Sequence, residues 1–115
     1  MIKNILIMCA ILLFSFSFSQ TGKASYYGGK FHGKKTSSGK IFNMNELTCS
    51  SMDYPLGTRL KITNLENNKS VEVLVTDRGG FKKYGRILDL SKGAFQKIAS
   101  LSKGIITIIV EKIET

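Results

Sequence analysis

The chain has 115 residues, of which 43% are hydrophobic and 22% are charged, and its formal net charge at pH 7 is +9. This composition is that of an ordinary folded domain and excludes an intrinsically disordered chain. The length allows one domain with a modest core and excludes a second lobe for a large cofactor.

Residues 1–19 have the pattern of a secretory signal peptide. A basic start containing Lys3 precedes the apolar run 5–14, and small serine residues lead up to Ser19. The apolar run is shorter than the roughly 20 residues that span a bilayer, so we expect no membrane anchor. Cys9 lacks the small preceding residue that a lipidation signal needs, so we do not expect a lipoprotein.

Export changes which partners the charge favours. Cleavage after Ser19 leaves residues 20–115, a domain of 96 residues whose net charge is +8 because Lys3 is lost. In the periplasm or cell envelope nucleic acid is not a partner, and the charge favours an anionic wall polymer or envelope surface. We expect a soluble monomer there.

Short strands separated by glycines and polar turns dominate this region. Residues 60–63 and 71–75 alternate apolar and polar side chains, and residues 66–69 between them supply a turn, so they predict a hairpin. The β-branched run 105–110 predicts a buried strand. The six expected strands are 23–27, 47–51, 60–63, 71–75, 86–90 and 105–110.

One short helix is expected between the last two strands. Ser91 is a natural N-cap, Phe95 and Ile98 mark an apolar face, and we expect the helix to end at Leu101 or Ser102, before Gly104. The fold class is therefore all-β with one short helix. A sandwich and a small closed barrel both fit, and the barrel is favoured because so short a chain would otherwise expose sheet edges.

The mature chain contains one cysteine and one histidine. Cys49 has no second cysteine with which to pair, and we expect it to be a small buried residue. His32 is expected to make a structural hydrogen bond in its turn. With no second histidine, a zinc site is not predicted, and we expect no cofactor.

Two aspartates stand at the ends of predicted strands. Asp77 precedes Arg78 and a Gly-Gly pair, and Asp89 lies between two leucines. In the simplest interpretation Asp89 caps the helix or pairs with Arg86 or Arg78. Two carboxylates beside an arginine also suit glycosidic chemistry, in which one acid protonates the leaving oxygen and the other group stabilises an oxocarbenium ion.

Several short motifs follow one another along the chain. They are 22–28 (GKASYYG), 31–33 (FHG), 36–39 (TSSG), 47–48 (LT), 55–58 (PLGT), 75–79 (VTDRG) and 87–91 (ILDLS). In this order and spacing they resemble the rare lipoprotein A (RlpA) family over residues 22–113. The resemblance implies a six-stranded double-psi β-barrel. It also implies endolytic cleavage of peptidoglycan glycan strands between N-acetylmuramic acid and N-acetylglucosamine, leaving 1,6-anhydro ends.

The resemblance also implies a set of site residues. Asp89 matches a general acid and Asp77 matches the acid of the Asp-Arg-Gly segment, so these two are the candidate catalytic residues. Of the adjacent tyrosines 26 and 27, which face opposite ways in a strand, we expect Tyr27 in the groove. The candidate substrate-binding residues are Tyr27, Thr36, Arg78 and Ser51.

The sequence departs from the family at two positions. Lys40 and Ser51 stand where active relatives have a glutamate and a histidine, which would remove a carboxylate and a proton carrier from the groove and add a positive charge. An expansin-like module that binds or loosens wall polysaccharide without cleaving it is therefore the alternative. An inhibitor of the barwin type fits less well, because such proteins rely on several disulfides.

Overall fold

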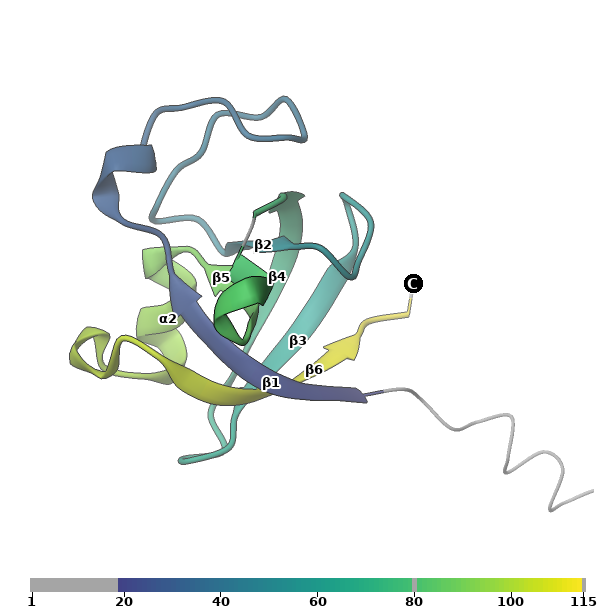
Figure 1. The fold of residues 1–115 in the computed structure, drawn as a ribbon, viewed down its shortest axis with the longest axis vertical. Coiled ribbons are helices and arrows are strands. Elements are labelled where there is room, and N and C mark those ends of the chain that lie inside the picture. Colours follow the sequence, from purple (N-terminus) through teal and green to yellow (C-terminus); the bar gives the residue numbers. More distant parts are fainter. Residues whose placement is uncertain (1–18, 80, 115) are drawn as a thin grey trace, which may run out of the picture.

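The computed structural model describes residues 19–79 and 81–114, and they form a closed β-barrel of six strands (Figure 1). The strands follow one another around the barrel in the order β1-β5-β2-β4-β3-β6. The predicted all-β barrel with one short helix is confirmed. The strands are β1 (Ser19–Tyr26), β2 (Thr48–Ser51), β3 (Arg59–Asn64), β4 (Ser70–Asp77), β5 (Arg86–Leu90) and β6 (Ile106–Lys112).

Parallel and antiparallel pairing are mixed in this barrel. Strands β1 and β5 pair in parallel, as do β2 and β4, whereas the other four neighbouring pairs are antiparallel. The predicted hairpin is confirmed as β3 and β4, with Leu60 opposite Val73 and Ile62 opposite Val71. Because every strand has two neighbours, no strand edge of the sheet is left open.

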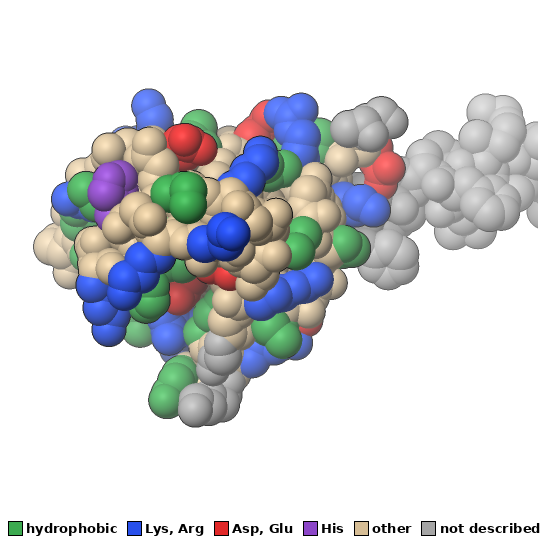
Figure 2. All heavy atoms as spheres, turned by 90° about the horizontal axis from the view of Figure 1, so that it is seen from above, with side chains coloured by type: hydrophobic (Ala, Val, Ile, Leu, Met, Phe, Trp, Pro, Cys, Tyr) green, Lys and Arg blue, Asp and Glu red, His purple; other side chains and the backbone are tan. Residues whose placement is uncertain are grey.

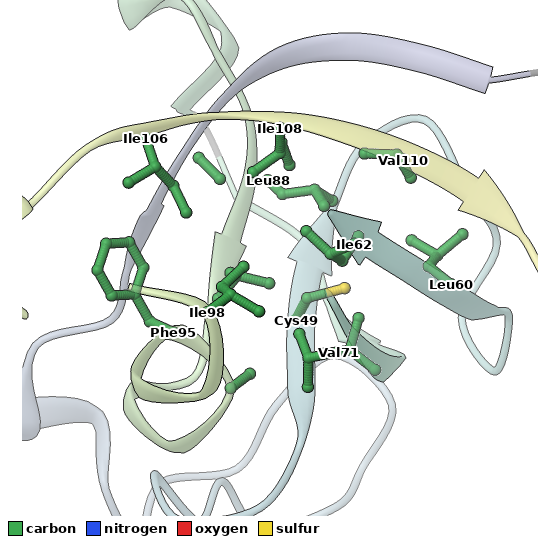
Figure 3. Packing of buried hydrophobic residues seen from close by; sticks show 14 of the residues in the cluster. Cys49, Leu60, Ile62, Val71, Leu88, Phe95, Ile98, Ile106, Ile108 and Val110 are labelled. Carbon is green, nitrogen blue, oxygen red and sulfur yellow. The ribbon is translucent and has the colours of Figure 1, made fainter. Parts of the chain in front are cut away.

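The interior is filled by alternate side chains of the strands and by one helix. The buried apolar side chains alternate along three strands. They are Leu60 and Ile62 in β3, Val71, Val73 and Val75 in β4, and Ile106, Ile108 and Val110 in β6. Figure 3 shows Phe95 and Ile98 packed with these strand residues. Cys49 is fully buried in the same cluster, as predicted.

The helix α2 (Lys92–Ile98) begins as predicted and ends earlier. The side chain of Ser91 accepts a hydrogen bond from the Ala94 N–H at 3.1 Å, which confirms the N-cap. The predicted end at Leu101 or Ser102 is wrong, because the chain is extended at Ala99 and a separate 3₁₀ turn, η3 (Leu101–Lys103), follows. The side chains of Asn64 and Asn67 donate to the Ile98 carbonyl, at 2.8 and 2.9 Å, and so satisfy the helix end.

A long connection, residues 27–47, arches over one end of the barrel and is called the β1–β2 loop below (Figure 1). It contains the 3₁₀ turn η1 (Gly29–Phe31). The Gly33 N–H donates to the Phe42 carbonyl at 2.8 Å, and the Ser38 N–H donates to the Thr76 carbonyl of β4 at 3.0 Å. The loop is therefore closed on itself and tied to the barrel.

The predicted signal peptide falls outside the described residues except for Ser19, which pairs with Glu111 at the start of β1. Within residues 19–79 and 81–114, no helix has the length and apolar character needed to cross a membrane.

Candidate active site

A cleft of about 420 Å³ opens where the β1–β2 loop faces the end of the barrel. Its other wall is the 3₁₀ turn η2 (Phe81–Tyr84), which precedes β5. Figure 2 looks onto the molecule from the side of this loop and shows Lys and Arg side chains spread over the face with few acidic ones. The cleft is lined by Tyr27, Phe31, Ser50, Asp77, Arg78, Gly79, Phe81, Tyr84, Arg86 and Asp89.

The register of the strands places the two predicted acids in one row. Ser50 of β2 pairs with Asp77 of β4 on one side and with Asp89 of β5 on the other, and Asp89 pairs in turn with Ser25 of β1. Neighbouring strands are about 4.8 Å apart, so the Cα atoms of the two aspartates are separated by about 10 Å. Acids that lie twelve positions apart in the sequence are thereby brought into one cleft.

Asp77 is held by hydrogen bonds from two sides. Its Oδ1 accepts from the Ser37 N–H at 3.0 Å, the Ser37 hydroxyl at 2.8 Å and the Arg78 N–H at 2.9 Å. Its Oδ2 accepts from the Tyr27 hydroxyl at 3.3 Å. Because a carboxylate only accepts hydrogen bonds, these donors fix its orientation and tie the β1–β2 loop to β4.

Asp89 has a different set of partners. Its Oδ1 accepts from the Ser25 hydroxyl and from Arg86 Nη1, the latter at 2.9 Å in an ion pair whose side chains are 23% and 19% exposed. The pairing with Arg86 that the sequence allowed is confirmed, whereas the helix cap is Ser91. Both bonds go to Oδ1, so within the described parts of the chain Oδ2 has no hydrogen bond and remains available to a ligand.

Aromatic side chains of the loop form one wall of the cleft. The ring of Tyr27 stacks on Phe42 with centroids 4.6 Å apart and meets the edge of Phe31 at 5.8 Å. Burial, reinforced by the Asp77 carboxylate, raises the pKa of Tyr27. The adjacent Tyr26 packs on Phe95 of the core at 4.7 Å. The expectation that the two tyrosines face opposite ways is confirmed.

The opposite wall was missed by sequence reasoning. The Arg86 guanidinium lies 5.9 Å from the ring centroids of both Phe81 and Tyr84, within the range of cation–π contact. Tyr84 is 67% exposed and Phe31 is 41% exposed. The signal in the sequence is the return of aromatic residues just after each Gly-Gly pair.

The structure places two predicted substrate-binding residues away from this cleft. Thr36 donates to the Lys40 carbonyl at 2.8 Å and lines a separate small pocket. The Ser51 side chain is fully buried, and its hydroxyl accepts from the N–H groups of Asp53 and Tyr54, at 3.1 and 3.3 Å. Neither side chain lines the cleft, because each is used to hold its own loop. The serine that faces the cleft is the preceding residue, Ser50.

Arg78 does line the cleft, but part of its guanidinium has a structural partner. Nη1 donates to the backbone carbonyls of Ser51 and Tyr54, at 2.8 and 2.9 Å. Arg78 therefore fixes the segment after β2 against the Asp77 loop. The expected positive charge of Lys40 in the groove is also corrected, since Lys40 lines the small pocket with Thr36 and not the cleft.

The predicted structural role of the histidine is confirmed, since His32 Nδ1 accepts from the Met44 N–H at 3.2 Å. In the part of the chain that the structure describes, no three His, Cys, Asp or Glu side chains are grouped to hold a metal ion.

A closed barrel with two parallel strand pairs, and a cleft with two carboxylates at one end, define the double-psi β-barrel class. The family model described as lytic transglycolase matches residues 19–110. The chain belongs to this family, of which the RlpA proteins are members, and the resemblance found in the sequence is thereby confirmed.

Individual proteins similar to this chain support the same family assignment. The endolytic peptidoglycan transglycosylase RlpA of Neisseria meningitidis serogroup A is 45% identical over 96 residues, which cover 84% of this chain and 40% of that protein. The protein of the same name from Campylobacter jejuni is 49% identical over 92 residues, covering 80% of this chain and 33% of that one. The chain thus spans less than half the length of these relatives.

Solved structures share the fold at low sequence identity. A Streptomyces papain inhibitor superposes with a TM-score of 0.68 at 22% identity, covering 84% of this chain and 96% of that one. A mutant expansin of Clavibacter michiganensis in complex with cellohexaose has a TM-score of 0.66 at 20% identity, covering 84% and 51% of the two chains. These likenesses show the fold.

Proposed function

We propose that the protein is an endolytic peptidoglycan transglycosylase that cleaves the glycosidic bond between N-acetylmuramic acid and N-acetylglucosamine and leaves 1,6-anhydromuramic ends. One observation carries the proposal: Asp77 and Asp89 face the same cleft in a single row across β4, β2 and β5. The names of the relatives at 45% and 49% identity support the reaction and the substrate.

Asp89 is the general acid in this proposal. Its Oδ2 has no partner among the described residues. When this oxygen carries a proton, Asp89 gives it to the glycosidic oxygen as the bond from that oxygen to C1 breaks, and the ion pair seen in the structure is the deprotonated state that this step leaves. The ion pair with Arg86 then stabilises the carboxylate that remains. The C6 hydroxyl of the muramic sugar closes on C1 and returns its proton to Asp89, so no water is consumed.

Asp77 assists from the other side of the row. Four hydrogen bonds hold its carboxylate in place, and a fixed negative charge stabilises the positive charge that develops at C1. The exposed rings of Phe31 and Tyr84 on the two walls offer flat apolar surfaces to sugar rings.

The site of action is part of the same proposal. We infer that residues 1–19 direct export, that Gln20 is the first mature residue, and that the protein acts as a monomer in the periplasm or cell envelope. The barrel supports this boundary, because Gln20 pairs with Val110 and every later pair of β1 is retained after cleavage. N-terminal sequencing of the exported protein tests the boundary.

The reaction is tested by incubating the purified protein with peptidoglycan sacculi and with peptide-free glycan strands, followed by mass spectrometry of the products. We expect anhydromuramic ends that are lost in Asp89→Asn. Loss of binding together with loss of product in that variant, or products ending in reducing muramic acid, would contradict the assigned chemistry.

Binding or loosening of wall polysaccharide without cleavage is the second candidate. It is motivated by Lys40 and Ser51, which the family resemblance sets where active relatives have a glutamate and a histidine, although neither side chain lines the cleft. Co-sedimentation with intact glycan and no soluble fragments from either substrate would establish this alternative and exclude the transglycosylase.

A further inference from the structure

In the part of the chain that the structure describes, a buried hydroxyl at the floor of the cleft makes no hydrogen bond. It belongs to Ser50, which is only 2% exposed and lines the cleft. The neighbouring Tyr27 hydroxyl donates to Asp77 at 3.3 Å. Burial raises the pKa of Tyr27 and the nearby Ser50 hydroxyl opposes this rise, but the two hydroxyls do not reach hydrogen-bond geometry. Buried polar groups are almost always paired, so an unpaired one in a binding cleft indicates a partner that arrives with the ligand.

The position of Ser50 is central in the row of acids. It pairs with Asp77 across one strand boundary and with Asp89 across the other. A carboxylate only accepts hydrogen bonds, whereas a serine hydroxyl both donates and accepts. Ser50 therefore adds, between two acceptors, a donor suited to an ether or glycosidic oxygen.

Gly79 lies beside this hydroxyl. A Cβ at this position would lie 3.2 Å from Ser50 Oγ and 2.8 Å from the ring of Phe81. The absence of a side chain thus lets the Phe81 ring pack against Gly79 without crowding Ser50, in the cleft that all three residues line.

We propose that Ser50 is a glycan-binding residue, whose hydroxyl makes with an oxygen of the bound sugar the hydrogen bond that is unmade in the free protein. This inference rests on the proposed function, because the ligand is the same glycan strand. It assigns the central contact between the two acids to a residue for which the family resemblance gave no role.

The variant Ser50→Ala tests the contact and separates binding from folding. We expect kcat/KM on peptide-free glycan to fall about tenfold and the dissociation constant for that glycan to rise by a similar factor. We expect an unchanged or higher melting temperature, because the variant removes an unpaired buried hydroxyl and keeps the side-chain volume.

A matched control is available on the same strand. Thr48 also has a buried hydroxyl without a partner, but it lines the small pocket beside Lys40 and not the cleft. The isosteric variant Thr48→Val should leave the melting temperature unchanged or higher, as Ser50→Ala does, and should leave kcat/KM and glycan binding at wild-type values.

The outcomes distinguish this inference from the proposed function. Wild-type binding and kcat/KM in Ser50→Ala would overturn the assignment, since water alone would then be the partner of the hydroxyl. A fall in melting temperature that fully accounts for the lost activity would also overturn it. If the wild-type protein binds glycan without cleaving it, the binding measurement still decides the role of Ser50. If it neither binds nor cleaves, the proposed function fails and the assignment fails with it.

Discussion

Asp77 and Asp89 are the same residue type held in different environments. Asp77 receives four hydrogen bonds on its two oxygens, which leaves it little freedom to turn. Asp89 receives two, both on Oδ1, and keeps the other oxygen for a ligand. The proposed roles of a fixed charge for Asp77 and a proton donor for Asp89 follow this difference in hydrogen bonding.

Asp77→Asn should reduce cleavage much more than binding. The amide oxygen can accept the bonds from Ser37 and Arg78, and the amide nitrogen can face the Tyr27 oxygen, so the fold is kept while the charge is lost. We expect product formation to fall about 100-fold, the scale seen for one electrostatic contact to a transition state. Rates of anhydro-product release and co-sedimentation with glycan check this. Equal losses in both would mean that Asp77 only holds the loop.

The buried thiol of Cys49 makes the stability of the fold depend on pH. Burial raises the pKa of its thiol to about 12, against about 8.5 for an exposed thiol. The folded protein keeps a proton that the unfolded chain loses between these values, so the free energy of unfolding falls as pH rises above about 8.5. The decline from this group approaches about 1.4 kcal/mol per pH unit.

Urea unfolding of the wild type and Cys49→Ala between pH 7 and about 10.5 measures this contribution. At pH 7 the variant has the lower free energy of unfolding, because a buried side chain is shortened. It lacks the thiol, so its free energy of unfolding does not share the decline at high pH. The difference in free energy of unfolding between wild type and variant should therefore narrow above about pH 9. Parallel curves over the whole range would contradict the inferred protonation of Cys49.

At the scale of elements, the loop that covers the cleft is positioned by close contact with the helix. The Gly93 N–H in α2 donates to the Met44 carbonyl at 2.8 Å. A Cβ at Gly93 would lie 2.7 Å from the carbonyl oxygen of Asn45, a backbone atom that cannot swing away. The β1–β2 loop and α2 therefore fit together only with glycine at this position.

Gly93→Ala should destabilise the protein by about 1–3 kcal/mol, the usual cost of forcing extra atoms into a packed contact. Gly28→Ala is the matched control, since Gly28 has φ −71° and a Cβ there meets nothing within 4 Å. Chemical denaturation of both variants provides the measurement. A Gly93→Ala protein as stable as the Gly28→Ala protein would show that the loop can shift without cost.

The elements differ in how far the sequence predicts them. Strands β3 and β4 show alternating apolar and polar residues and β6 is a β-branched run, so the sequence predicts all three. The sequence also predicts the helix cap at Ser91, because this signal is local. The β1–β2 loop was not, because its shape depends on distant bonds such as that from Ser38 to Thr76. The helix end was misplaced for the same reason, since Asn64 and Asn67 satisfy it from another hairpin.

The candidate site divides in the same way. Asp77, Asp89 and Tyr27 were found because motif and strand alternation indicate them. Ser50 was missed because its place between the two acids depends on which strands become neighbours in the closed barrel. Arg86 was named only as one possible partner of Asp89, and the structure selects it.

At the scale of the whole molecule, basic residues outnumber acidic ones. The chain has 17 Lys and Arg residues against 8 Asp and Glu. Exposed ion pairs such as Arg59–Glu72 and Lys103–Glu66 neutralise some of them. Lys82 is paired with Asp53, whose pKa it lowers. Figure 2 shows further basic side chains spread over the face seen from the side of the β1–β2 loop.

This distribution predicts that salt weakens binding to wall polymer. Intact peptidoglycan carries carboxylates on its stem peptides, and peptide-free glycan carries the lactyl carboxylate of each muramic sugar. The Debye length falls from about 10 Å at 0.1 M salt to about 3 Å at 1 M, which removes most of the attraction between exposed charges. Affinity for intact sacculi and for peptide-free glycan should therefore both fall several-fold between about 0.05 and 0.5 M NaCl. Co-sedimentation across this range measures both, and affinities that do not change with salt would show that the basic surface does not act on these carboxylates.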